Sequence, residues 1–334
     1  MRTNLSRRAL VGAVTAAVTA VALSACGTTE ETAETEASTA VSAGPVDLTD
    51  ERGAVHLDAP ATKVVSLEWG PTETLLALGV KPVGAADVKG YNTYDTQAPL
   101  DAATADLGTR GEPSLDAIMA LTPDLVVTTV DLPENVIKQI ADQVPVIAIK
   151  GSDGADPIGY MRKTVTLLAQ ATGTTTQGEK LLADFDAKIT EGKAALATAG
   201  KTGAPFTMAD GWLQDGTVAL RMYTPGSFFG AVAKELGLTN QWTEGGDKDY
   251  GLAQTDIEGL TKITNADSKF VYVANQSEGG KEFEAALTGN AVWKTTPFGK
   301  ASNTDRIPDG IWMFGSVPSA NAYADALIAA FTGK

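Results

Sequence analysis

The sequence predicts an α/β fold in which two lobes are joined by a single long α-helix. The 334 residues, 43% of them hydrophobic, are enough to build two domains with separate cores. Short apolar runs typical of buried strands alternate with segments of helical periodicity, and this alternation occurs twice along the chain. An unbroken helical pattern lies between the two occurrences. The predicted boundaries are residues 47–173 for the N-terminal lobe, 174–200 for the connecting helix and 201–334 for the C-terminal lobe.

The predicted connection is one helix over residues 176–198. Thr176 and Glu179 have the spacing of a capping box, in which the two side chains satisfy free backbone N–H groups of the first turn. Gly200 is expected to end the helix in a left-handed conformation. The large apolar residues recur at spacings of three, four and seven and predict one buried face: Leu182, Phe185, Ile189 and Leu196. Because one helix rather than several flexible strands would join the lobes, we expect a small closure motion and a largely preformed cleft.

Residues 1–25 are predicted to be a secretory signal peptide. Three arginines precede an apolar run, Ala9–Ala22, which is short for a membrane span and is followed by small residues. The single cysteine, Cys26, ends the sequence LSAC, which resembles a bacterial lipobox. We therefore predict that Cys26 is the lipidated first residue of the exported chain; an ordinary signal peptide with a chance cysteine is the alternative. The pattern leaves open whether export is by the Sec or the twin-arginine route.

Residues 26–46 are predicted to form a flexible tether. Threonine, glutamate, alanine and serine dominate this segment, and it has too few large apolar residues to build a core. A segment of this length reaches roughly 25 Å, enough to hold a globular protein just off a membrane. Because Cys26 is the only cysteine, the exported chain is expected to have no disulfide bond.

The N-terminal lobe is predicted from short strands that alternate with helices. Ser114 and Asp156 are typical N-caps, and Asp116 lies in the first turn after Ser114. A loop is expected to carry Tyr91 and Tyr94. The predicted strands are 63–68, 82–86, 124–130 and 144–149, and the predicted helices are 72–78, the segment after Ser114, 133–142 and the segment from Asp156 to about residue 173.

The C-terminal lobe repeats the sequence pattern of the first lobe. Residues 226–238 (GSFFGAVAKELGL) are similar to residues 70–80 (GPTETLLALGV), and a second, longer pair of segments, 256–274 and 114–129, is also similar. This repeat suggests two lobes related by a pseudo-twofold axis. A strand at 311–314 and a helix at 319–331 are predicted to complete the chain. Because the lobes are connected once, the cleft between them is the expected ligand site.

Charge and motifs exclude several classes of function. Removal of residues 1–25 leaves 23 basic against 41 acidic residues, a net charge of −18, which excludes nucleic acid as a partner. The sequence contains no Gly-x-Ser-x-Gly elbow, no P-loop and no dinucleotide-binding fingerprint. The single histidine, His56, lacks a second histidine or a nearby cysteine and is expected to be an ordinary residue of a strand or turn. We therefore predict a binding protein, not an enzyme, with no cofactor and no metal held by the protein itself.

Aromatic residues and one arginine are the candidate ligand-binding groups. All five tryptophans lie near predicted element ends or in loops, as does Tyr223, where aromatic rings line a cleft or belong to the core. Arginine is scarce beyond the signal peptide. Arg110 lies between two glycines in a loop, where a fixed guanidinium could hold ligand oxygens; a surface ion pair is the alternative.

Four segments resemble a known family. LEWGPTETLLALGVKPVGAAD, LGTRGEPSLDAIMALTPDLVV, AVWKTTPF and IPDGIWMFG resemble the iron-siderophore substrate-binding proteins of bacterial ABC importers, and the resemblance is strongest to the ferric hydroxamate (ferrichrome-type) receptors. It covers nearly all of residues 63–331. The resemblance implies the class III periplasmic-binding-protein-like fold, an extracytoplasmic location on the cell membrane, and delivery of a ferric siderophore to a permease and its ATPase by a monomer. The iron would be held by the siderophore.

The resemblance also implies roles for individual residues. Arg110 matches the arginine that holds hydroxamate oxygens around the iron. Asp116 and Glu258 match one acid on each lobe that docks on the permease, although both positions also suit the first turn of a helix. Five aromatic residues match positions along the cleft: Trp69, Trp242, Tyr250, Trp312 and Phe314.

The charge of the chain favours a hydroxamate ligand. A ferric tris-hydroxamate is neutral or weakly positive, whereas a ferric tris-catecholate is strongly negative and would need several cations in the cleft. One arginine among aromatic residues on a protein of charge −18 suits the former. The alternatives are a receptor of the same fold for a catecholate siderophore, haem or cobalamin, and an extracellular lipoprotein enzyme.

Overall fold

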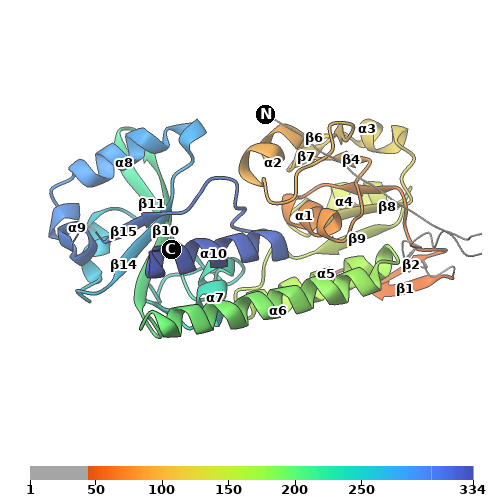
Figure 1. Cartoon of the computed structure of the whole chain (residues 1–334). Helices are drawn as coiled ribbons and strands as arrows, with labels where there is room; N and C mark the ends of the chain where they lie inside the picture. The colour runs from red at the N-terminus through yellow and green to blue at the C-terminus, as the bar shows by residue number, and fades with distance from the viewer. Residues whose placement is uncertain (1–43, 302, 334) are drawn as a thin grey trace, which may run out of the picture. The chain divides into compact units, whose positions relative to one another are not determined.

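The computed structural model describes residues 44–301 and 303–333. These residues belong to one compact unit (Figure 1). The predicted signal peptide, Cys26 and all but the last three residues of the predicted tether lie outside the described residues. Among the helices that the structure describes, none combines the length and the apolar character that a membrane crossing requires.

The first half of the described chain forms a parallel sheet of five short strands. Their order is β5-β4-β3-β8-β9, and every neighbouring pair is parallel. The two longest strands are buried along their whole length, as expected for a parallel sheet covered on both faces. The strands are β3 (Val64–Ser66), β4 (Gly84–Ala85), β5 (Ala105–Asp106), β8 (Leu125–Thr129) and β9 (Val146–Ile149).

Five helices and two antiparallel hairpins accompany this sheet. The hairpin of β6 (Gly108–Thr109) and β7 (Glu112–Pro113) has a two-residue turn, and Arg110 lies in that turn. The other hairpin pairs β1 (Val46–Thr49) with β2 (Ala54–Leu57). The helices are α1 (Trp69–Ala77), α2 (Val88–Tyr94), α3 (Leu115–Ala120), α4 (Glu134–Ala141) and α5 (Pro157–Ala171).

The predicted connecting helix is present as α6 (Thr175–Thr198), but its predicted capping box is wrong. The N-cap is Thr174, whose side chain makes no capping hydrogen bond. The backbone N–H of Thr174 closes the end of α5 on the carbonyl of Ala169, at 2.8 Å, so the chain turns directly from one helix into the next. Thr176 therefore lies inside the first turn of α6.

The predicted C-terminal cap and apolar face of α6 are confirmed. Gly200 has a φ of +68°, and the following N–H donates to the carbonyl of Leu196 at 2.8 Å, as in a Schellman motif. Of the four predicted apolar residues, three are buried and Leu182 is half-buried. Two glycines of the same face, Gly178 and Gly192, let neighbouring side chains approach, and α6 packs along α5 and α10 (Figure 1).

The second half of the chain forms a mixed sheet of six strands. The order β13-β11-β10-β14-β15 combines two antiparallel pairs, β10 with β11 and β11 with β13, with two parallel pairs. β12 pairs with β10 in parallel. The strands are β10 (Pro205–Gln214), β11 (Thr217–Tyr223), β12 (Thr239–Asn240), β13 (Leu252–Thr255), β14 (Lys269–Val273) and β15 (Thr304–Arg306).

Four α-helices and three short 3₁₀ helices complete the second half. The α-helices are α7 (Phe228–Glu235), α8 (Gly280–Gly289), α9 (Pro297–Ala301) and α10 (Val317–Thr332). The 3₁₀ helices are η1 (Glu258–Lys262), η2 (Gln276–Glu278) and η3 (Trp293–Thr295).

Three further predictions differ from the structure. Tyr91 and Tyr94 lie in helix α2 and not in a loop, because Asp87 caps that helix by accepting the N–H of Gly90 at 3.0 Å. Helix α1 begins at Trp69, three residues before the predicted start, because Glu68 is its N-cap. Residues 311–314 form no strand, since the N–H of Trp312 donates to the side chain of Ser319 instead of to a neighbouring strand. The lobe boundaries remain a prediction.

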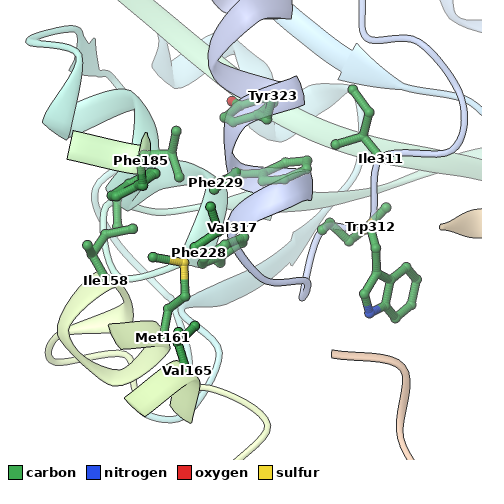
Figure 2. Packing of buried hydrophobic residues seen from close by; sticks show 14 of the residues in the cluster. Ile158, Met161, Val165, Phe185, Phe228, Phe229, Ile311, Trp312, Val317 and Tyr323 are labelled. Atoms are coloured by element: carbon green, nitrogen blue, oxygen red, sulfur yellow. The ribbon is translucent and has the colours of Figure 1, made fainter. Parts of the chain in front are cut away.

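The largest hydrophobic cluster is continuous across both halves of the chain. It contains residues of both sheets, such as Val64 and Phe206, and of the helices that connect them. Phe229 and Tyr323 stack in it with ring centroids 3.8 Å apart. Figure 2 shows side chains of this cluster from α5, α6, α7 and α10, among them Met161, Val165, Phe185, Phe228, Phe229 and Tyr323. Each sheet has a smaller cluster of its own. The cluster explains how the two sheets are held together beside the connecting helix.

Candidate functional site: a cleft between the two sheets

Two adjoining cavities form a cleft between the sheets. One has a volume of about 380 Å³ and the other about 350 Å³, and both are lined by Arg110, Arg221 and Trp312. Arg110 belongs to the first half of the chain and Arg221 to the second, so both halves contribute to the same space. Volumes of this size are typical of small-molecule sites.

Arg110 is held in the cleft by a carboxylate and an indole. Its Nη1 donates to Oε1 of Glu68 at 2.7 Å, and its guanidinium carbon lies 4.0 Å from the ring centroid of Trp69. Glu68 also accepts the N–H of Trp69 at 2.9 Å and so caps α1. The start of α1 therefore orients the arginine. The side chain of Arg110 is 35% exposed, which leaves N–H groups of the guanidinium accessible from the cleft.

Arg221 is held more rigidly on the second sheet. It lies directly opposite Asp210 in the antiparallel pair β10–β11, and its Nε donates to Asp210 Oδ1 at 3.0 Å while Nη2 binds Oδ2. Burial raises the pKa of Asp210, and the charge of Arg221 offsets part of that rise. The guanidinium carbon lies 5.4 Å from the ring centroid of Phe314. The result is a bidentate ion pair with a face toward the cleft.

Aromatic side chains line the rest of the cleft. Trp69 contacts Trp312 edge to face with centroids 4.7 Å apart, and it stacks on Tyr94 at 5.7 Å. Phe314 continues this series, 5.2 Å from Trp312 and 5.5 Å from Tyr250. Such rings offer rigid apolar area at low entropic cost. They come from α1, α2, the irregular segment before α10 and the loop before β13.

Tyr250 joins the two halves of the cleft. Its hydroxyl donates to Asp131 Oδ2 at 2.6 Å, and Asp131 follows strand β8 of the first sheet. Burial, together with this hydrogen bond, raises the pKa of Tyr250, so the hydroxyl keeps its proton at neutral pH. The loop that follows β8 contains Val130, Asp131 and Leu132, and Asp131 is the residue of this loop that binds Tyr250.

The structure brings most, but not all, of the predicted ligand-binding residues into the cleft. Tyr223 is fully buried below Arg221, with its hydroxyl 3.4 Å from Nη2, and it lines neither cavity. Trp242 packs in the hydrophobic cluster of the second sheet, where Lys262 Nζ lies 5.6 Å from its ring centroid. The remaining predicted residues line the cavities: Trp69, Arg110, Tyr250, Trp312 and Phe314.

Three further cleft residues, Arg221, Tyr94 and Trp212, were not among the residues assigned to the ligand site, although Trp212 was a candidate together with the other tryptophans. Arg221 was missed because its position depends on strand pairing with Asp210, which the sequence pattern does not reveal. Tyr94 was expected in a loop without an assigned role. Trp212 lines the larger cavity and is 40% exposed, an unusual exposure for a tryptophan. The available signal in the sequence was its place near a predicted element end.

The two predicted docking acids occupy matching positions. Asp116 lies in the first turn of α3, which Ser114 caps, and Glu258 lies in the first turn of η1, where Asp256 accepts the N–H of Gly259 at 2.9 Å. Both acids are exposed, and neither has an ion-pair partner among the described residues. They are therefore accessible to a partner.

The described residues contain no group of three or more His, Cys, Asp or Glu side chains that could hold a metal ion. His56 lies in strand β2 and is exposed, with Nδ1 2.7 Å from Oδ1 of Asp47. The hydrogen bond and charge of Asp47 raise the pKa of His56. His56 lines neither cavity of the cleft and cannot ligate a group bound there.

Comparison with known proteins gives a consistent result. A family model described as periplasmic binding protein matches residues 64–309. The iron(3+)-hydroxamate-binding protein FhuD of Escherichia coli (strain K12) is 28% identical over 81% of this chain and 88% of its own length. The probable siderophore-binding lipoprotein YfiY of Bacillus subtilis (strain 168) is 26% identical, over 91% of this chain and 92% of its own.

The solved structures agree on the fold. The crystal structure of Fe³⁺–Desferal-bound FhuD from Vibrio cholerae superposes with a TM-score of 0.71 at 24% identity, over 81% of this chain and 98% of that one. This similarity confirms the predicted α/β class and its periplasmic-binding-protein architecture. With the family model matching most of the described residues, the chain belongs to the periplasmic binding protein family, a family of binding proteins and not of enzymes.

Proposed function

We propose that this protein binds a ferric siderophore of the hydroxamate type in the cleft and delivers it to an ABC permease and its ATPase. Relatives named for iron(3+)-hydroxamate and siderophore binding support the general function. The choice of hydroxamate rests on the charge of the cleft, since other relatives are named for Fe(3+)-citrate and ferric enterobactin.

One observation carries the choice of ligand: each arginine of the cleft already has a carboxylate partner. Arg110 pairs with Glu68 and Arg221 with Asp210. The larger cavity is also lined by Glu278 and by Asp309, which pairs with Arg306. The two arginine charges are therefore already balanced. No unpaired cation among the described residues would remain in the cleft to compensate the three negative charges of a ferric tris-catecholate. A neutral or weakly positive ferric hydroxamate avoids this cost.

The side chains of the cleft have complementary roles in this proposal. The guanidinium groups of Arg110 and Arg221 donate hydrogen bonds to the hydroxamate oxygens around the iron. The aromatic side chains cover the apolar linkers between the hydroxamate groups: Trp69, Tyr94, Trp212, Tyr250, Trp312 and Phe314. The iron stays within the siderophore, so no side chain acts as a metal ligand.

Location and docking complete the proposal. Cys26 carries a lipid that anchors the chain to the outer face of the cell membrane, with residues 26–46 as the tether. Asp116 and Glu258 contact the permease, one from each half of the protein. The protein acts as a monomer, because a cleft built from both halves of one chain needs no second copy.

A titration against a panel of ferric chelates tests the proposal. Quenching of tryptophan fluorescence in the purified protein reports binding, because Trp69, Trp212 and Trp312 line the cleft. We expect tight binding of ferrioxamine B and ferrichrome, and affinity at least tenfold lower for ferric enterobactin and ferric citrate. A preference for enterobactin would overturn the hydroxamate assignment. Absence of binding to every ferric chelate would overturn the siderophore function itself.

A further inference from the structure

A buried glutamate connects the first helix of the chain to the last. Glu73 lies in α1, one turn after Trp69, and its side chain is fully buried. Its two carboxylate oxygens accept backbone N–H groups at the start of α10: Oε2 binds the N–H of Ser316 and Oε1 that of Ser319, the latter at 2.7 Å. The bonded residues are 243 and 246 positions apart in sequence.

Glu73 takes the place of a capping residue for α10. The N-cap of that helix is Ser316, whose own side chain makes no capping hydrogen bond, and its hydroxyl is buried without a partner among the described residues. The first N–H groups of a helix need acceptors, and the positive end of the helix dipole favours a carboxylate. A residue from a distant element therefore fixes where α10 begins.

The segment just before α10 lines the cleft. Residues 311–315 carry Trp312 and Phe314, and the N–H of Trp312 donates to Ser319 Oγ at 3.1 Å. The backbone N–H of Ser319 thus donates to the carboxylate of Glu73, and the side-chain Oγ of Ser319 accepts the N–H of Trp312. Two hydrogen bonds link the buried acid to the aromatic residue.

The same segment rests directly on α1. A Cβ atom added at Gly315 would lie 2.3 Å from Oε2 of Glu73, and one added at Gly70 would lie 2.8 Å from the carbonyl oxygen of Phe314. The backbone of Gly315 therefore lies directly against the carboxylate of Glu73, and the backbone of Gly70 lies directly against that of Phe314. Trp312 in turn contacts Trp69 and lies beside Arg110.

From this arrangement we infer that Glu73 is a positioning residue of the ligand cleft. By fixing the first turn of α10 against α1, it fixes Trp312 and Phe314 relative to Trp69 and Arg110. The effect on ligand affinity rests on the proposed siderophore function, whereas the effect on the backbone does not. Glu73 makes no contact with the ligand itself, since it lines neither cavity.

The test compares Glu73→Gln with a matched substitution away from the cleft. Glutamine keeps the shape but has one oxygen acceptor, and its amide N–H₂ would face a backbone donor. Glu51→Gln is the control, because Glu51 also links distant elements, through Tyr160 and Lys163, and lines neither cavity. The measurements are amide hydrogen exchange of the folded protein and the affinity and dissociation rate of ferrioxamine B.

We expect Glu73→Gln to speed exchange of the Trp312, Ser316 and Ser319 amides at least tenfold, and to weaken ferrioxamine B binding at least fivefold through faster dissociation. Exchange in strand β8 should not change, and Glu51→Gln should leave both measurements at the cleft unchanged. If Glu73→Gln does not fold, the same measurements are made on Glu73→Asp. Aspartate keeps the charge, but its shorter side chain should bind only one of the two N–H groups, of Ser316 and Ser319. Unchanged exchange and affinity in a folded variant would overturn the inference. If the wild type binds no ferric siderophore, only the proposed function fails, and the exchange data still test Glu73.

Discussion

The two sheets each contribute one arginine to the cleft, but they hold it in different ways. Arg110 lies in the two-residue turn of a short hairpin, bound by one hydrogen bond to Glu68. Arg221 lies within a strand, bound at two points to Asp210 on the neighbouring strand. The side chain of Asp210 is 13% exposed, against 22% for Glu68. The first arginine can therefore adapt to a ligand, whereas the second is part of the framework.

The difference predicts that loss of Arg221 affects folding most strongly. Arg221→Ala would leave the carboxylate of Asp210 buried without its cation, and the free energy of unfolding should fall by about 3 kcal/mol. Urea denaturation measures this change. The double variant Arg221→Ala/Asp210→Ala should recover much of the loss, because it removes the unpaired charge as well. Equal stability losses for the Arg221 and Arg110 variants would contradict the distinction.

Buried acids in the first half of the chain have no arginine partner, and this predicts a pH dependence. Burial raises the pKa of Glu73 to about 7 and that of Asp95 to about 9, and the two carboxyls also repel each other. Groups with raised pKa values bind protons more tightly in the folded state than in the unfolded one. The stability that this provides is present at pH 5 and is lost as the pH rises toward 9.

The free energy of unfolding should therefore fall by at least about 2 kcal/mol between pH 5 and pH 8.5. Carboxyls whose pKa is lowered, such as Glu51 and Asp247, change their protonation mainly below pH 5. They therefore have little effect on the free energy of unfolding between pH 5 and pH 8.5. In Asp95→Asn the decrease should be smaller, and the variant should be more stable than the wild type at pH 8.5. Parallel pH profiles for the two proteins would show that Asp95 is ionised in the folded state.

Loss of Arg110 should affect binding more than folding. Arg110→Ala removes a charged donor from the cleft and should weaken ferrioxamine B binding by about 2 kcal/mol, roughly 30-fold. Its ion pair with Glu68, which is only partly buried, should contribute no more than about 1 kcal/mol to stability. Arg162→Ala is the control, because Arg162 pairs with Asp186 outside both cavities. An unchanged affinity would remove Arg110 from the ligand site.

The same contrast explains how much the sequence could predict. Four of the five strands of the first sheet and α6 were predictable because buried strands and amphipathic helices leave local patterns, and Arg110 was singled out by the glycines that flank its loop. Arg221 required knowledge of strand register, which depends on residues far away in the chain. The capping of α10 by Glu73 was equally hidden, since no pattern relates residues 243 positions apart. Trp242 was expected along the cleft because it matches a cleft position of the resembled family, and Tyr223 because it lies near a predicted element end, a place that suits a core residue as well as a cleft residue.

The smallest predicted effect concerns the hydrogen bond that joins the two halves. Tyr250→Phe removes the donor to Asp131 but keeps the ring beside Phe314. Because Asp131 is exposed to water, the free energy of unfolding should fall by about 1 kcal/mol or less. Ferrioxamine B affinity should change less than threefold, since the ring and not the hydroxyl covers the ligand. A tenfold loss of affinity without a loss of stability would instead make the Tyr250 hydroxyl a ligand contact, so that it would join the two arginines as a third polar group that binds the ligand.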